Sequence, residues 1–236
     1  MSIKPLGFVL LSGGIDSSTA LAYAIRDCSE VLAISVDYGQ RHRREILAAQ
    51  DVARYYGIQH KTVDIIGIPK VMLTDKDAEV PNMSYSDIKG VSPTYVPFRN
   101  GQLISKIAGI AAHQCNITQS QGRIYIGTHA EDAAGDAYPD CRFDFVGAMA
   151  AAVYIGTYHA VQLIAPLIAM YKDDIVREGS RLGVPYELTW SCYKGEALHC
   201  GTCPTCRARH EGFVKAMVKD PTVYATREAF RGSIAG

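Results

Sequence analysis

The sequence has no long hydrophobic run and no excess of charge of either sign. No apolar stretch approaches the roughly 20 residues that cross a membrane as a helix, so we expect a soluble protein without a membrane partner. The 24 basic residues are balanced by 24 acidic ones, so the chain has no long-range field that attracts nucleic acid. These absences exclude a membrane-spanning protein and argue against direct nucleic-acid binding.

Features typical of secreted proteins are also missing. The first strand-like run starts at residue 6, which leaves no room for a signal peptide. We therefore expect a cytoplasmic protein whose seven cysteines stay reduced rather than pair in disulfides. A chain of 236 residues can build one sizeable core with a small appendage, and two domains of equal size are not expected.

Residues 6–21, LGFVLLSGGIDSSTAL, predict a strand, a glycine turn and a helix in direct succession. Residues 6–11 are apolar and too few for an ordinary helix, which indicates a buried parallel strand. The glycine pair lets the backbone approach a ligand closely, and free N–H groups at the start of a helix over residues 19–26 form a site for phosphate. The candidate helix caps are Ser12, Asp16, Ser17 and Ser18. For the glycines alone, a tight turn with a serine cap is the alternative, because neither GxxxxGK[ST] nor GxGxxG is present.

Strand and helix patterns then alternate along the chain. The expected strands are residues 30–36, 61–65, 123–127 and 161–165, and the expected helices are residues 43–56, 102–115, 143–156 and 171–182. This order predicts an α/β protein with a parallel five-stranded sheet and helices on both of its faces. The polar, proline-containing tract at residues 69–97 is either a substrate lid or a surface insertion. A change of composition near residues 183–188 divides the chain into residues 1–185 and a small subdomain at 186–236.

Four cysteines of the C-terminal region have the spacing of a metal site. Cys192, Cys200, Cys203 and Cys206 form the pattern C-x7-C-x2-C-x2-C. Four thiolates in a reducing compartment favour one tetrahedral zinc ion per chain, and a site with four protein ligands is structural rather than catalytic. An iron–sulfur cluster is the main alternative, and unrelated buried cysteines are another. Cys28 and Cys115 are expected to pack in the core.

Several polar residues are expected at the carboxyl ends of strands, where ligands bind in sheets of this kind. Asp37 ends the second strand, and the loop at residues 128–141 contains Glu131, Asp132, Asp136 and Asp140. Such acids indicate either a ligand site or a solvated loop. We expect Asn100 to cap the helix that follows it, which places Arg99 at a helix N-terminus, where a cation is unfavourable unless an anion joins it.

The string SGGIDSS at residues 12–18 resembles the pyrophosphate loop of the N-type ATP pyrophosphatases, enzymes that cleave ATP between the α and β phosphates. The chain as a whole resembles the QueC family of this superfamily, on SVDYGQRH at residues 35–42, TYVPFRN at 94–100, YPDCR at 138–142 and the four cysteines. The resemblance runs nearly end to end. It implies a Rossmann-like (HUP-type) fold, a homodimer, and conversion of 7-carboxy-7-deazaguanine and ammonia to 7-cyano-7-deazaguanine with ATP and Mg²⁺.

The resemblance also implies roles for particular residues. The catalytic residues it implies are Asp16, which would hold Mg²⁺, and the pyrophosphate-neutralising cations Arg99 and Lys172, each of which is otherwise a surface cation. The ATP-binding residues it implies are Leu11, Ser12, Gly13, Gly14, Ile15, Asp16, Ser17, Ser18, Thr19, Ala20 and Leu21, with Asp37, Tyr38 and Gln40 beside the adenosine. The substrate-binding residues it implies are Phe98, Arg99, Asp132 and Asp140, and the zinc ligands are Cys192, Cys200, Cys203 and Cys206.

The chain departs from the family pattern on the substrate side. Phe98 stands where the family commonly has glycine, and the loop between Asp132 and Tyr138 is about two residues longer than is usual. Two other functions use the same motifs. One is a tRNA thiolase of the same superfamily with a cysteine-held cluster, which the neutral charge disfavours. The other is a nucleotide-binding module with a zinc tail and no enzymatic activity, which the acidic Asp16 in a phosphate loop disfavours.

Overall fold

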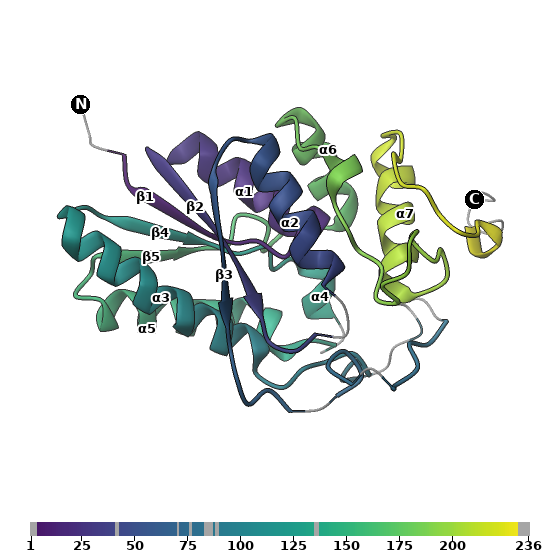
Figure 1. Cartoon of the computed structure of the whole chain (residues 1–236), viewed down its shortest axis with the longest axis horizontal. Helices are drawn as coiled ribbons and strands as arrows, with labels where there is room; N and C mark the ends of the chain where they lie inside the picture. The colour runs from purple at the N-terminus through teal and green to yellow at the C-terminus, as the bar shows by residue number, and fades with distance from the viewer. Residues whose placement is uncertain are drawn as a thin grey trace.

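The computed structural model describes residues 4–40, 43–69, 71–75, 77–82, 87, 90–134 and 137–230. Within these residues, five parallel strands form one sheet in the order β3-β2-β1-β4-β5 (Figure 1). The strands are β1 (Leu6–Leu10), β2 (Glu30–Asp37), β3 (Gln59–Asp64), β4 (Gly122–Tyr125) and β5 (Val161–Ile164). The predicted five-stranded parallel sheet is therefore confirmed, and each predicted strand overlaps an observed one.

Helices cover both faces of the sheet, as the sequence predicts. Adjacent residues of β1 point to opposite faces, because side chains alternate along a strand. Val9 packs with α1 (Ile15–Asp27) and α2 (Arg44–Tyr55), and Phe8 packs with α3 (Arg99–Thr118) and α5 (Phe143–Gly156). None of the helices in the described part of the chain is long and apolar enough to cross a membrane.

The strand order reverses direction between β1 and β4. The chain runs from β1 outward through β2 to β3, and α3 then returns it to the other side of β1. At such a switch point the loops after the two central strands separate, which opens a crevice at their carboxyl ends. The glycine turn follows β1 and the acidic loop follows β4, so the fold brings these two predicted ligand segments together.

The C-terminal region packs against one end of the sheet domain. Helix α7 (Pro204–Ala216) lies beside α6 (Lys172–Arg181) in Figure 1. Phe213 of α7 shares a buried cluster with Ile15 of α1 and Ile175 of α6. This region also carries the four clustered cysteines, so the predicted four-cysteine cluster is present at the C-terminal end. The division at residue 185 stays a prediction.

Two helix starts differ from the sequence prediction. Helix α1 begins at Ile15 rather than residue 19, with Gly14 at its N-cap and no side-chain cap. The predicted serine and aspartate caps are wrong, because Asp16, Ser17 and Ser18 lie inside the helix and Ser12 Oγ contacts Ser17 Oγ at 3.0 Å. Helix α3 begins at Arg99, and Asn100 is inside it rather than at its cap.

The true acceptor at the start of α3 comes from a distant segment. The Asn100 backbone N–H donates to Asp140 Oδ2 at 2.9 Å, so a carboxylate from the loop after β4 replaces the expected asparagine cap. That loop is also more regular than predicted, because it contains α4 (Ala130–Ala133) and a 3-10 turn (Pro139–Cys141). Asp136 lies outside the described residues. Cys28 and Cys115 are buried in the core, as predicted.

Candidate active site

A cavity of about 280 Å³ opens at the carboxyl ends of β1, β2 and β4. Its walls come from the loop after β1, the turn after β2 with the start of α2, the loop after β4, the start of α6, and the C-terminal region. The start of α3 closes a further side. This is the position at which open parallel sheets bind ligands.

The glycine turn forms one wall because it packs directly on α2. Gly13 has a φ of +79°, and a Cβ atom there would lie 2.5 Å from the Glu45 carbonyl oxygen. Only glycine fits this position. The predicted ATP-binding residues that line the cavity are Leu11, Ser12, Gly14, Ile15, Asp16 and Ser17, and beyond the turn Tyr38 and Gln40. Those that do not line it are Gly13, Ser18, Thr19, Ala20, Leu21 and Asp37.

The residues behind the turn hold it in place. Thr19, Ala20 and Leu21 are fully buried in α1. Thr19 Oγ1 donates to the Ile15 carbonyl at 2.9 Å and lies 3.1 Å from the Tyr186 hydroxyl. Thr19 therefore links the first turn of α1 to the segment that precedes the cysteines.

Asp16 and Lys172, which are 156 residues apart, form an ion pair inside the cavity. Lys172 Nζ donates to Asp16 Oδ1 at 2.7 Å, and the lysine side chain is 13% exposed. Burial would raise the pKa of Asp16, but the charges of Lys172 and His129 outweigh it and lower that pKa. Burial would lower the pKa of Lys172, but Asp16 and Asp132 raise it. Both groups are therefore charged at neutral pH.

His129 and Asp132 extend this cluster from the loop after β4. His129 Nε2 lies 3.0 Å from Lys172 Nζ and 3.3 Å from Asp132 Oδ2. The imidazole is almost fully buried, and its Nδ1 has no hydrogen-bond partner among the described residues. A Cβ atom on Gly127 would lie 2.8 Å from the Ser17 backbone nitrogen, so this loop packs closely on the start of α1. The start of α1, the loop after β4 and the start of α6 thus bring two acids and two basic groups together.

Arg99 faces the cavity from the start of α3. Its Nη1 donates to the Tyr38 hydroxyl at 3.4 Å, and its guanidinium lies 5.8 Å from the centre of the Tyr38 ring. Glu45 also lines the cavity, and burial raises its pKa to about 7 although the charge of Arg99 opposes this shift. Asp37 lies outside the cavity lining, where its carboxylate accepts from the Gly39 N–H at 3.1 Å.

Phe98 and Asp140 do not line the cavity. Phe98 has a left-handed φ of 54°, and its half-exposed ring packs edge-on against Phe145 at 5.6 Å between ring centres. Asp140 is buried at the start of α3 as described above. Both assignments to substrate binding stay predictions, whereas Arg99 and Asp132 line the cavity.

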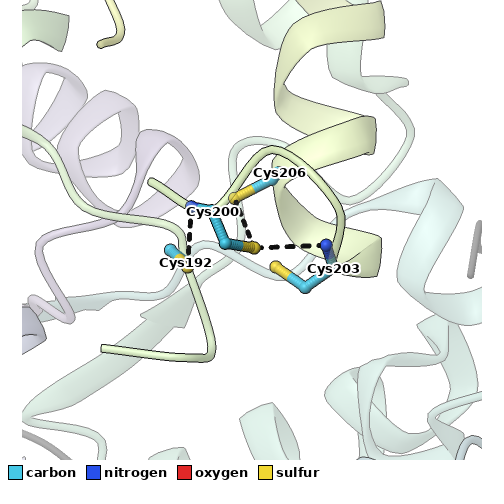
Figure 2. Close-up of side chains that lie close together, drawn as sticks. All are labelled: Cys192, Cys200, Cys203 and Cys206. Carbon is cyan, nitrogen blue, oxygen red and sulfur yellow. Dashed lines mark hydrogen bonds between the residues drawn. The ribbon is translucent and has the colours of Figure 1, made fainter. Parts of the chain in front are cut away.

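The four cysteines come together as their spacing predicts. Their Sγ atoms all lie within 4.8 Å of one another, and all four side chains are buried (Figure 2). A tetrahedral ion with bonds of about 2.3 Å to sulfur requires sulfur atoms roughly 3.8 Å apart, which this set accommodates. Backbone N–H groups of Thr202 and Cys203 donate to Cys200 Sγ at 3.4 and 3.3 Å, a contact suited to a thiolate. The cluster can hold a metal ion.

Several residues of the cavity had no role predicted from the sequence. His129 comes from the loop after β4, Glu45 from the start of α2, and Trp190 and Arg209 from the C-terminal region. Glu131, one of the acids that the sequence placed in the loop after β4, also lines the cavity. A signal existed for His129, because it follows a predicted strand as closely as Asp132 does. No local pattern indicated Trp190 or Arg209, because they reach the cavity only through the packing of α7.

A family model described as Queuosine biosynthesis protein QueC matches residues 7–217. A 7-cyano-7-deazaguanine synthase from Thermoplasma acidophilum is 46% identical over 229 residues, covering 94% of this chain and 93% of that protein. A protein of the same name from Caldicellulosiruptor bescii is 42% identical over 219 residues, covering 92% of this chain and 96% of that protein. Among solved structures, the U34-tRNA thiolase NcsA from Methanococcus maripaludis aligns with a TM-score of 0.42 and 19% identity, covering 89% of this chain and 64% of that chain.

Proposed function

The chain belongs to the QueC family, and we propose that it is an ATP-dependent ligase that converts 7-carboxy-7-deazaguanine and ammonia to 7-cyano-7-deazaguanine (preQ0). The observation that carries the proposal is its 46% identity, over 94% of the chain, to a 7-cyano-7-deazaguanine synthase. The cavity supports it, because a phosphate loop, cations and acids line one space.

The first proposed step activates the acid. A carboxylate oxygen of the substrate attacks the α-phosphorus of ATP, and the bond to the β-phosphate breaks so that pyrophosphate leaves with its electron pair. We assign Lys172 and Arg99 to the negative charge that gathers on the leaving group, together with the N–H groups at the start of α1. We assign Asp16 to the Mg²⁺ that accompanies ATP.

Three further steps build the nitrile. Ammonia attacks the acyl carbon, the bond to AMP breaks, and one N–H proton is lost as the amide forms. The amide oxygen then attacks the α-phosphorus of a second ATP, and pyrophosphate leaves. Loss of AMP and of the two remaining N–H protons leaves the nitrile. Both adenylation steps turn a poor leaving oxygen into AMP, so one phosphate loop can serve both.

We assign the base to the half of the cavity that follows β4. Asp132 lines this half and supplies a carboxylate for the guanine-like N1–H and amino donors. For Phe98 and Asp140 we propose only that they hold the start of α3, and with it Arg99, in position. Phe98 is the N-cap of α3, and Asp140 accepts from the Asn100 N–H.

An assay with the proposed substrates tests this function. Protein supplied with ATP, Mg²⁺, ammonium and 7-carboxy-7-deazaguanine should form AMP and a product whose mass corresponds to an acid turned into a nitrile. The tRNA thiolase with a cysteine-held cluster is the rival, and no observation on this chain favours it. AMP formation with tRNA and a sulfur donor, but none with the base, would support the rival and contradict the proposal.

We propose zinc, one ion per chain, as the metal of the four-cysteine site. Cys192, Cys200, Cys203 and Cys206 would occupy all four tetrahedral positions, so the ion would stabilise this region rather than activate water. A cytoplasmic location and a homodimer are also proposed, from the reduced cysteines and the family. We propose that the product feeds 7-deazaguanine modification of tRNA or DNA.

Replacing Cys203 with serine should remove the metal and destabilise the C-terminal region, because metal binding there contributes directly to folding. Elemental analysis should find about one zinc ion per chain in the wild-type protein and a large loss in the variant. Cys28→Ser, a buried cysteine outside the cluster, is the control and should keep the metal. Brown protein containing iron and sulfide would contradict zinc.

A further inference from the structure

Trp190 connects the phosphate loop to the four-cysteine site. Its backbone N–H donates to the Gly13 carbonyl oxygen at 2.8 Å. Its indole Nε1 donates to the carbonyl oxygen of Cys192 at 2.9 Å, and Cys192 is one of the four clustered cysteines. One residue therefore contacts both sites through hydrogen bonds of ordinary length.

The bond to Gly13 fixes the orientation of the peptide that binds phosphate. A trans peptide is planar, with its C=O and N–H groups pointing in opposite directions. Since Trp190 holds the Gly13 carbonyl on one side, the N–H of Gly14 must point to the other, where Ser12 Oγ accepts from it at the long distance of 3.5 Å. Gly14 lines the cavity and is the N-cap of α1, where an N–H group contributes to an anion site. The position of Trp190 thus affects a donor of the phosphate loop.

A second cysteine holds Trp190 through its neighbour in sequence. The rings of Trp190 and His199 are in contact, tilted by 37° with their centres 4.2 Å apart, and His199 precedes Cys200. The Ser191 N–H donates to His199 Nε2 at 3.2 Å. The Trp190 ring and the backbone of Ser191 are therefore both in contact with the residue that precedes Cys200.

Arg209 anchors the same segment from α7. Among the described residues it is the largest fully buried side chain, at 2% exposure, and it lies one helical turn beyond Cys206. Its guanidinium donates to Thr189 Oγ1 at 2.8 Å, to Ser191 Oγ at 3.1 Å and to the Tyr186 carbonyl at 2.8 Å. These bonds flank Trp190 on both sides, so Arg209 holds the segment in one place.

We propose that the four-cysteine site positions the phosphate loop for ATP through Trp190, with Arg209 as a positioning residue. The metal holds three segments of chain together, and all three converge on residues 189–191. Metal binding and ATP binding are therefore coupled. By linkage, the factor by which the metal tightens ATP binding equals the factor by which ATP tightens metal binding. The inference rests on the proposed function only in that the loop binds ATP.

The first experiment measures this coupling in the full-length protein. Trp190 is the only tryptophan in the chain, so its fluorescence reports on the site without a label. Removing the metal with a chelator should weaken Mg-ATP binding about tenfold, within the usual range for coupled sites, and Zn²⁺ should restore it. In the reverse experiment, saturating Mg-ATP should raise the apparent zinc affinity in competition with a chelator by a similar factor. A blank without protein corrects for zinc held by ATP.

The second experiment tests Arg209 with the metal in place. Arg209→Met keeps all four cysteines and should retain the metal while its ATP affinity falls about tenfold. Arg207→Met is the matched control: Arg207 is on the same helix, donates to the Thr202 carbonyl at 3.2 Å and does not line the cavity. Thr189→Val, which removes one acceptor of Arg209, gives a milder change in the same direction if Arg209→Met does not fold.

The outcomes separate this inference from the proposed function. Loaded wild-type protein that fails to bind ATP overturns both. Wild-type protein that binds ATP equally well with and without metal, judged folded by circular dichroism, overturns the coupling alone. If metal removal unfolds the chain, the coupling is tested with the metal-loaded variants instead. Equal ATP affinity for Arg209→Met, Thr189→Val and Arg207→Met then overturns the inference.

Discussion

Replacing Asp16 with asparagine should lower AMP formation at least about 100-fold while the fold survives. The carboxylate lies in the cavity, and Lys172 and His129 keep its pKa low despite its burial, so it carries its charge at neutral pH. Asparagine keeps the shape of the side chain but cannot offer a negative charge to Mg²⁺. It also leaves Lys172 without the acceptor that now lies 2.7 Å from its Nζ.

The measurement is single-turnover formation of AMP from ATP and 7-carboxy-7-deazaguanine, with thermal unfolding recorded alongside. Asp51→Asn is the matched control, because Asp51 lies on α2 in an exposed ion pair with Arg54 and away from the cavity. Near-normal turnover by the Asp16 variant would refute its assignment to Mg²⁺. A variant that loses activity and fold together would show that the pair with Lys172 is chiefly structural.

The strand, glycine turn and helix at the start of the chain could be predicted because their cause is local. The short apolar run indicates a buried strand, and glycine permits the left-handed backbone that the turn requires at Gly13. The cysteine cluster is local in the same sense, since two-residue gaps bring Cys200, Cys203 and Cys206 together. Features specified within about ten residues are the ones that sequence patterns describe well.

The ion pair and the caps could not be predicted, because they depend on tertiary packing. Lys172 reaches Asp16 across 156 residues, and only the sheet order brings β4, α1 and α6 to one edge. Asn100 had the right chemistry for a cap, yet Asp140 supplies a charged acceptor from 40 residues away. Charge-assisted hydrogen bonds are stronger than neutral ones, so the distant aspartate prevails over the local amide.

Glu45 shows the same limit on the side of the glycine turn. The sequence pattern assigns no role to Glu45, but α2 packs so tightly on Gly13 that the start of the helix borders the cavity. The family resemblance likewise pointed to Phe98 and Asp140, which lie next to Arg99 in the sequence or in space. Proximity to a site residue did not place their side chains in the cavity.

Asp132 is the acid whose removal should most affect use of the base. It lines the cavity beside His129, whereas Asp140 is buried against the start of α3. If Asp132 accepts the N1–H and amino donors, Asp132→Asn turns an acceptor into a donor and leaves the base unsatisfied in a partly dry site. The specificity constant for 7-carboxy-7-deazaguanine should then fall by a factor that corresponds to a loss of transition-state stabilisation on the order of 2 to 4 kcal/mol, and the ATP affinity should change little.

Asp140→Asn is the comparison that separates recognition from support. It replaces the carboxylate that accepts from the Asn100 N–H at 2.9 Å, so it should lower the unfolding temperature more than it alters discrimination between bases. A base analogue without the 2-amino group sharpens the contrast. Its specificity constant should be lower than that of 7-carboxy-7-deazaguanine in the wild-type protein and in the Asp140 variant, but not in the Asp132 variant. If neither substitution alters use of the base while both leave ATP binding intact, the loop after β4 is not the base site. The carboxylate of Glu45 beside Arg99 would then be the next acid of the cavity to test.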